Sequence, residues 1–130
     1  MIEGKIWGET ESIFGSESVS VHVLKIRKGG YSSRHFHKIK SNYFHVLKGA
    51  VLIREWQGQS ESALVDGTTL RAGQRASVSP GVWHQFEALE DSEMIEIYIA
   101  GLMGPDIERM GHGGLKCEAE IKAGKKKSEE

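Results

Sequence analysis

Short runs of apolar and β-branched residues alternate with glycine and polar turns along most of the chain. Residues 18–27 read SVSVHVLKIR, where Val19, Val21 and Val23 recur at every second position and would share one face of a strand. Similar runs follow at roughly ten-residue spacing, over residues 43–47, 50–56, 75–79, 85–89 and 93–100. No segment keeps a helical period for long, and only residues 105–110 favour a single helical turn. The pattern predicts an all-β sandwich or barrel of short antiparallel strands.

Turn-forming residues and the absence of an internal repeat indicate one domain. Residues 57–60 and the pair Asp66-Gly67 have the composition of hairpin turns, because glycine tolerates a positive φ. We expect a single domain over residues 1–121, with its core in residues 18–100. A short edge strand is expected near residues 115–121. Residues 122–130 are charged and are expected to form a disordered tail.

Composition and charge narrow the classes of partner. The 130 residues carry a net charge of −1, so no long-range field would attract nucleic acid or an anionic membrane. No apolar run has the length of a membrane span or a signal sequence. Cys117 is the single cysteine, which fits a reducing compartment. We expect a cytoplasmic protein whose partner is a small molecule.

Two histidines stand at a spacing suited to binding a metal ion. His35 and His37 are two residues apart in a strand-like segment, so both side chains project from one face. Their Cα atoms would lie roughly 6.5–7 Å apart, a distance over which two imidazoles can bind one ion. The same parity places Tyr31 and Ser33 on that face, as candidates for the lining of a substrate pocket.

The order of residues around this pair resembles the two signature motifs of the cupin superfamily. In that family, a glycine is followed by His-x-His, a glutamate and a second glycine, and later by Gly, Pro-x-Gly and a histidine. The corresponding residues here are Gly29, His35, His37, Gly49 and the segment 73–84, which ends in His84. The resemblance implies a cupin-type double-stranded β-helix, or jelly-roll barrel. It also implies one divalent ion (Zn, Fe, Mn or Ni) bound by His35, His37 and His84.

The chain departs from these motifs at three positions. Asn42 replaces the family's glutamate ligand, Ser79 stands in the usual proline position, and Ala88 replaces an asparagine. A neutral amide is a weaker ligand than a carboxylate, which leaves three imidazoles and a cationic site. Asn42 is expected either to coordinate weakly or through water, or only to form hydrogen bonds within the barrel.

The other three histidines are expected to lie away from the metal. On a regular strand Asn42, Phe44 and Val46 share a face and His45 points the other way. His22 lies opposite the valine face of residues 18–27, and we interpret it as structural. His112 lies in a glycine-rich segment and is expected to be exposed.

A finer resemblance concerns the C-terminal barrel of type II mannose-6-phosphate isomerases. The similar pieces are residues 5–8 (KIWG), 46–49 (VLKG), 95–97 (IEI) and 106–109 (DIER). This chain lacks the nucleotidyltransferase domain of those enzymes and their glutamate at position 42. The likeness implies an isomerase or epimerase acting on a sugar or sugar phosphate.

Three functions remain open at this point. The first is a metal-dependent isomerase or epimerase of a small polar metabolite, for which no general base is obvious and Glu87 and Tyr31 are candidates. The second is an Fe(II) dioxygenase with three histidine ligands, and the third is a non-catalytic metal-dependent barrel that binds a ligand. Pocket candidates include Phe44 and Phe86, and the catalytic residues are not identified. A homodimer is expected, with Ile6, Trp7, Ile13 and Phe14 as possible contacts.

Overall fold

The computed structural model describes residues 2–58, 64–99 and 107–117, and these form two antiparallel β-sheets without a helix. One sheet has the strand order β1-β2-β3-β11-β6-β9. Its strands are β1 (Ile2–Lys5), β2 (Gly8–Gly15), β3 (Val19–Ile26), β6 (Ser41–Lys48), β9 (Arg75–Val78) and β11 (Ser92–Ile99). The second sheet has the order β12-β5-β10-β4-β13, with β7 pairing β10 and β8. Its strands are β4 (Gly30–Tyr31), β5 (Arg34–His37), β7 (Ala50–Trp56), β8 (Leu64–Arg71), β10 (Trp83–Ala88), β12 (Ile107–Met110) and β13 (Gly114–Leu115).

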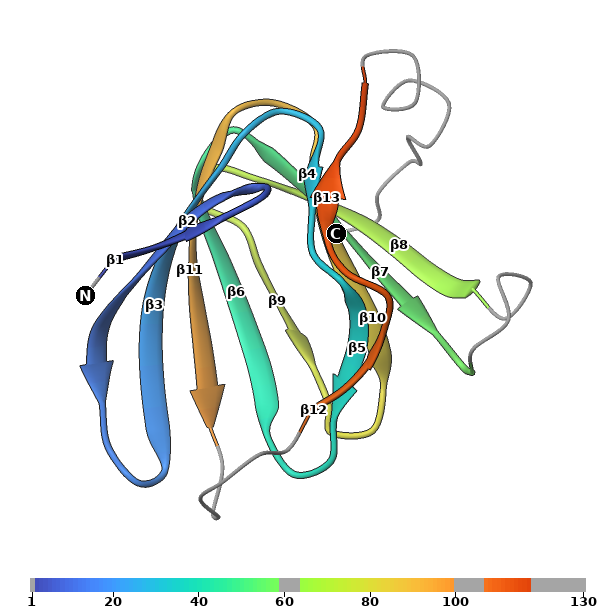
Figure 1. Cartoon of the computed structure of the whole chain (residues 1–130). Helices are drawn as coiled ribbons and strands as arrows, with labels where there is room; N and C mark the ends of the chain where they lie inside the picture. Colours follow the sequence, from blue (N-terminus) through green and yellow to red (C-terminus); the bar gives the residue numbers. More distant parts are fainter. Residues whose placement is uncertain (1, 59–63, 100–106, 118–130) are drawn as a thin grey trace.

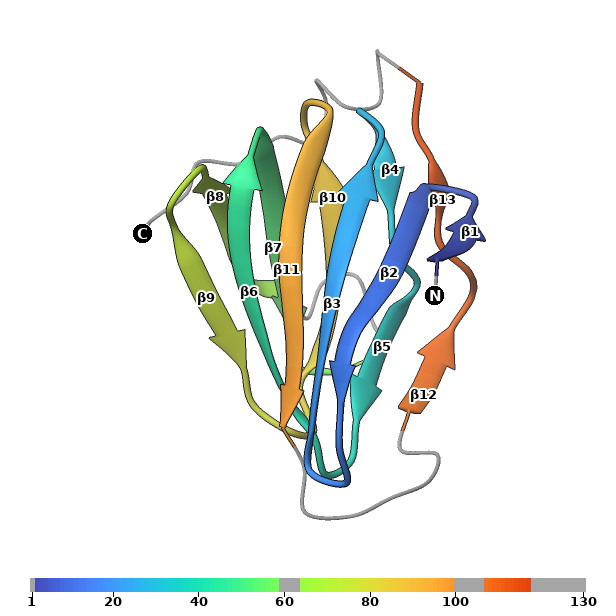
Figure 2. The same ribbon diagram turned by 90° about the vertical axis from the view of Figure 1, so that its left-hand side faces the viewer.

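The two sheets face each other and enclose the apolar core (Figures 1 and 2). Both sheets contribute buried side chains to one cluster: Leu24, Ile26, Phe44, Val46, Val51, Ile53, Leu70, Val78, Phe86, Ala88 and Met94. The all-β jelly-roll prediction is therefore confirmed. None of the described segments contains a helix long and apolar enough to span a membrane.

The predicted strands are present, but two local predictions were wrong. Asp66-Gly67 is not a turn, because it lies inside β8, where Asp66 accepts a hydrogen bond from Thr68. β8 pairs antiparallel with β7 along its length, and of the turn expected at residues 57–60 only residues 57 and 58 are among the described residues. The expected helical turn near Met110 is also wrong, since Ile107–Met110 pairs with β5 as a strand. The expected tail over 122–130 lies outside the described residues.

The three valines share one face of β3, as predicted, but the opposite face points into the molecule. Leu24 and Ile26 are 1% and 2% exposed, whereas Val19, Val21 and Val23 are only half-buried. The three valines lie beside Ile95, Ile97 and Ile99 of β11 on the outer surface of the sheet. His22 therefore shares the inward face with Leu24 and lines the cavity described below.

The N-terminal segment adds a hairpin that the strand pattern did not predict. β1 pairs only with β2 at the edge of the six-stranded sheet. Trp7, in the turn of this hairpin, accepts a backbone hydrogen bond from Arg27 and lies against Gly30 of the other sheet. In both ribbon views the hairpin reaches the neighbourhood of β13 (Figures 1 and 2). Residues near both ends of the described chain thus meet at one edge of the sandwich.

Candidate metal centre and its cavity

The three histidines named from the motifs come together in the interior. His35 and His37 are on β5, and His84 on β10 lies directly opposite His35 in the antiparallel register. One potential ligand atom from each lies within 4.8 Å of the others, and all three residues are buried. Their ring centroids are 4.5–5.8 Å apart. The histidines are therefore positioned to bind a single metal ion.

Hydrogen bonds to backbone carbonyls fix which nitrogen faces the centre. Nδ1 of His35 is 2.7 Å from the Ser33 carbonyl oxygen, and Nδ1 of His84 is 2.9 Å from that of Val82. A carbonyl can only accept, so each Nδ1 carries the proton and each Nε2 keeps its lone pair. Nε2 of His84 is buried without a hydrogen-bond partner. These features fit a metal ion, which would use the lone pairs on Nε2.

Burial keeps the imidazoles in the neutral form that a metal requires. Burial lowers the pKa of His35 to about 3, and the nearby positive charges of His84, His37 and Arg109 contribute to the decrease. Burial also lowers the pKa of His84. A protonated imidazole cannot coordinate, so these histidines are ready to bind metal at neutral pH.

Asn42 lies beside this group but makes a hydrogen bond in another direction. Its Nδ2 donates to Glu96 Oε2 at 2.9 Å, while its Oδ1 is buried without a partner. The group of potential ligands contains no carboxylate among the described residues. Whether Asn42 coordinates weakly remains a prediction.

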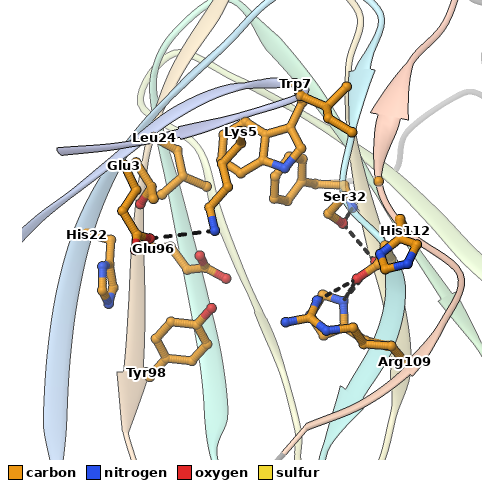
Figure 3. A pocket seen from close by; sticks show the side chains of 16 residues that line it. Glu3, Lys5, Trp7, His22, Leu24, Ser32, Glu96, Tyr98, Arg109 and His112 are labelled. Atoms are coloured by element: carbon orange, nitrogen blue, oxygen red, sulfur yellow. Dashed lines mark hydrogen bonds and ion pairs between the residues drawn. The ribbon is translucent and has the colours of Figure 1, made fainter.

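A cavity of about 570 Å³ opens beside the centre and reaches His35. Its walls carry further side chains that were not among the candidate site residues (Figure 3). They come from both sheets and the N-terminal hairpin: Lys5, Trp7, His22, Glu96, Tyr98 and Arg109. His112 is exposed, as predicted, but it too lines this cavity.

Glu96 and Tyr98 form a hydrogen-bonded pair on β11 next to the histidines. Glu96 is 7% exposed and accepts hydrogen bonds from Asn42 and Tyr98. Burial raises the pKa of Glu96 to about 7, although both hydrogen bonds oppose the increase. The ring of Tyr98 lies 5.2 Å from that of His37. A carboxyl group that can change its protonation state near neutral pH therefore lies beside the candidate metal centre.

The pocket candidates chosen from the sequence divide into two groups. Ser33 and Phe86 line the cavity, and Phe86 packs against Trp7 with a centroid distance of 5.1 Å. Phe44 instead belongs to the core and lies 6.2 Å from the ring of His84. Tyr31 is outside the cavity lining and lies against Gly114 of β13.

The two general-base candidates chosen from the sequence lie away from the cavity. Glu87 is fully buried, with an ion pair to Arg54 at 2.7 Å and one to Lys116 at 3.1 Å. Glu87 and His84 are three residues apart on β10, so their side chains project from opposite faces of the strand. Tyr31 pairs with Glu87 in the same sheet. Neither residue lines the cavity that reaches His35.

The prediction for His45 is confirmed. Asn42, Phe44 and Val46 are each at most 1% exposed and point inward. His45 lines a groove with Tyr43, Arg75 and Ile97 on the outer surface of the six-stranded sheet. It therefore cannot substitute for the missing glutamate ligand.

Solved structures share this architecture. KdgF from Halomonas sp. aligns with a TM-score of 0.61 and 17% identity, over 71% of this chain and 77% of that one. A conserved protein of unknown function from Streptococcus pyogenes aligns with a TM-score of 0.59 and 17% identity, over 72% of this chain and 75% of its own. Oxalate decarboxylase from Bacillus subtilis gives 0.70 and 14% identity over 85% of this chain, which spans 30% of that enzyme.

These likenesses show that the chain has the cupin fold. No protein-family model matches the sequence, and no curated protein is significantly similar to it. The finer resemblance to type II mannose-6-phosphate isomerases is accordingly not confirmed.

Proposed function

We propose that the chain is a divalent-metal-dependent enzyme that transfers a proton on a small polar metabolite, as isomerases and epimerases of sugars do. The observation that carries this proposal is the position of Glu96. Its buried carboxyl group lines the cavity that reaches His35, and it is held by Asn42 and Tyr98. An enzyme of this class needs both an electrophile and a general base within one site.

The residues divide this chemistry between them. A divalent ion held by neutral imidazoles would polarise a carbonyl group and acidify the neighbouring C–H bond. In our proposal the carboxylate of Glu96 accepts that proton, and the hydrogen bonds from Asn42 and Tyr98 stabilise the carboxylate form before transfer. Protonated Glu96 then returns the proton to the same carbon or to a neighbouring one. Return to the neighbouring carbon isomerises the metabolite. Return to the same carbon inverts its configuration when the planar intermediate turns its other face to Glu96 before the proton is returned.

The structural neighbours support the metal and the size of the metabolite. Oxalate decarboxylase of B. subtilis has Mn(II) centres, and its name gives oxalate, a small polar molecule, as its substrate. The cavity of about 570 Å³ in this chain also has the size of a site for small metabolites.

A second candidate is an Fe(II) dioxygenase. The observation in its favour is the ligand group itself, which consists of three histidines and no carboxylate among the described residues. Such a group leaves positions on the ion for both a substrate and O₂.

The exchange of substrate hydrogen for solvent deuterium tests the proposed proton transfer without knowledge of the product. Zn²⁺-loaded protein is incubated in D₂O with small aldoses, ketoses and their phosphates, and the carbon next to the carbonyl is followed by ¹H NMR. We expect exchange with at least one of these compounds, slowed about 100-fold or more in Glu96→Gln, because general bases contribute at least that much. Glu93→Gln is the matched control, since Glu93 lies on the same strand at a position of opposite parity.

Two results would contradict the proposal. One is exchange at the wild-type rate in Glu96→Gln, and the other is no exchange above the protein-free rate with any compound. Oxygen uptake by the Fe(II)-loaded protein would favour the dioxygenase instead. Metal binding without either reaction would favour a non-catalytic barrel that binds a ligand.

A further inference from the structure

An arginine near the C-terminal end of the described chain enters the cavity beside the histidines. β12 pairs with β5 so that Arg109 lies directly opposite His35. Directly opposed residues of an antiparallel pair project from the same face, with Cβ atoms about 4.5–5.5 Å apart. Arg109 accordingly lines the cavity, on the side opposite Glu96 and Tyr98 (Figure 3).

A hydrogen bond to Ser33 holds Arg109 in this position. Its Nη1 donates to Ser33 Oγ at 2.9 Å, and the same oxygen is 3.2 Å from Nδ1 of His35. A guanidinium group has five N–H donors, so this contact uses a small part of its capacity. Ser33 therefore positions Arg109 next to a candidate metal ligand.

No carboxylate neutralises Arg109 within residues 2–58, 64–99 and 107–117. Arg54 and Arg71 differ in this respect, since Arg54 pairs with Glu87 at 2.7 Å and Arg71 with Glu90 at 3.8 Å. A cation that faces a cavity without a carboxylate partner is typical of a site for an anion.

The other charges in the cavity do not cancel that of Arg109. Lys5, which also lines the cavity, pairs with Glu3 at 3.6 Å. Burial raises the pKa of Glu96 to about 7, so this group is only partly ionised at neutral pH. The remaining excess is positive, and a divalent ion on the three histidines would increase it. The cavity is therefore suited to a negatively charged molecule.

We propose that Arg109 binds the anionic group, a carboxylate or a phosphate, of the metabolite that the candidate metal centre takes. This inference rests on the proposed function for the identity of the site. The fork of a guanidinium group matches the oxygens of either anion, and it stays charged at every physiological pH. The metabolite would extend from the three histidines to Arg109 and pass beside Glu96.

Three compounds with the same carbon skeleton test this assignment. Glycerol, glycerate and glycerol 3-phosphate differ in the charge of one end, and their binding is measured by calorimetry on Zn²⁺-loaded and EDTA-treated protein. We expect at least one anion to bind about tenfold or more tightly than glycerol, because a charge-assisted hydrogen bond contributes that much. The anion that binds more tightly identifies the group as carboxylate or phosphate.

The variants show whether Arg109 causes the preference. In Arg109→Gln the preference for the anion over glycerol should fall about tenfold or more. Arg109→Lys should keep part of this preference because the charge remains. Arg75→Gln is the control, since Arg75 is exposed and lines the outer groove. Unchanged thermal unfolding of each variant shows that the fold is intact.

The outcomes separate this inference from the proposed function. A preference that persists in Arg109→Gln would overturn it, and so would glycerol binding as tightly as both anions. Anion binding that depends on Arg109, in a protein that fails the deuterium exchange test, would support the anion site and contradict the proton-transfer function. Exchange that depends on Glu96 but not on the charge at the end of the metabolite would support the proton-transfer function and contradict the anion site.

Discussion

Glu96 illustrates how position on a strand decides the chemistry of a single residue. The sequence of β11 places Glu96 between Ile95 and Ile97, and a pattern of this kind usually points the isoleucines inward. In the structure the isoleucines point outward, and Glu96 shares the interior with Met94. The acid–base group was therefore missed, because parity alone does not tell which face of a strand is buried.

The ionisation of Glu96 should be visible in the stability of the metal-free protein. The unfolded state releases this proton near pH 4.5, whereas burial raises the pKa in the folded state to about 7. The stabilisation is thus fully present below pH 4.5 and is lost as the pH rises to 7. Glu96→Gln removes this loss, so its stability relative to wild type should increase by about 3 kcal/mol between pH 4.5 and 7. Urea unfolding at several pH values measures the difference.

His35 contributes to the pH dependence of stability with the opposite sign, and it is present in both the wild type and Glu96→Gln. Its pKa falls to about 3, so its contribution is present above pH 6.5 and decreases as the pH falls towards 3. Comparison of the variant with wild type cancels this contribution. A difference in stability that stays constant with pH would show that Glu96 is not held in its neutral form.

At the scale of elements, the connection between β6 and β7 is the shortest between consecutive strands in the part of the chain that the structure describes. Gly49 alone separates the end of one strand from the start of the next, and the two strands belong to different sheets. Its φ of 89° is in the region that glycine adopts without strain. A Cβ at this position would also meet Ser92 Oγ and the carbonyl oxygen of Asp91. This is the physical reason for a glycine at this point of the motif.

Replacement of this glycine should therefore be costly. Gly49→Ala combines backbone strain with a close contact, so we expect a decrease of about 1–3 kcal/mol in the free energy of unfolding. Gly15→Ala is the matched control, because it has no positive φ and a Cβ there meets nothing within 4 Å. Equal stability of the two variants, measured by urea unfolding, would contradict the role given to Gly49.

Elements far apart in sequence explain why most of the cavity lining could not be predicted. His35, His37 and His84 were found because their spacing follows a known motif. Arg109 enters the site through the pairing of β12 with β5, and Lys5 through the N-terminal hairpin. Such long-range pairings leave no local signal in the sequence. The strand pattern predicted neither the N-terminal hairpin nor β12.

For the whole molecule, the sequence pattern was sufficient for the fold class but not for the arrangement of its surfaces. The spacing of strands and the motif residues predicted a cupin barrel, and the two facing sheets confirm it. The outer surface of the six-stranded sheet is unexpectedly apolar, with Tyr43 and Ile99 42% and 44% exposed. The expected homodimer remains a prediction. Trp7, named as a possible contact, packs inward against Phe86.

The binding of one divalent ion by the three histidines is the central claim of this account, and direct metal titration tests it. Calorimetry with Zn²⁺ and Mn²⁺ at pH 7.5 should give one site per chain in the wild type. In His84→Ala the affinity should fall about 100-fold or more, because one of three ligands is lost. His45→Ala, which changes a histidine on the outer surface, should bind as the wild type does. Full binding by a folded His84→Ala variant, or none by the wild type, would contradict the claim.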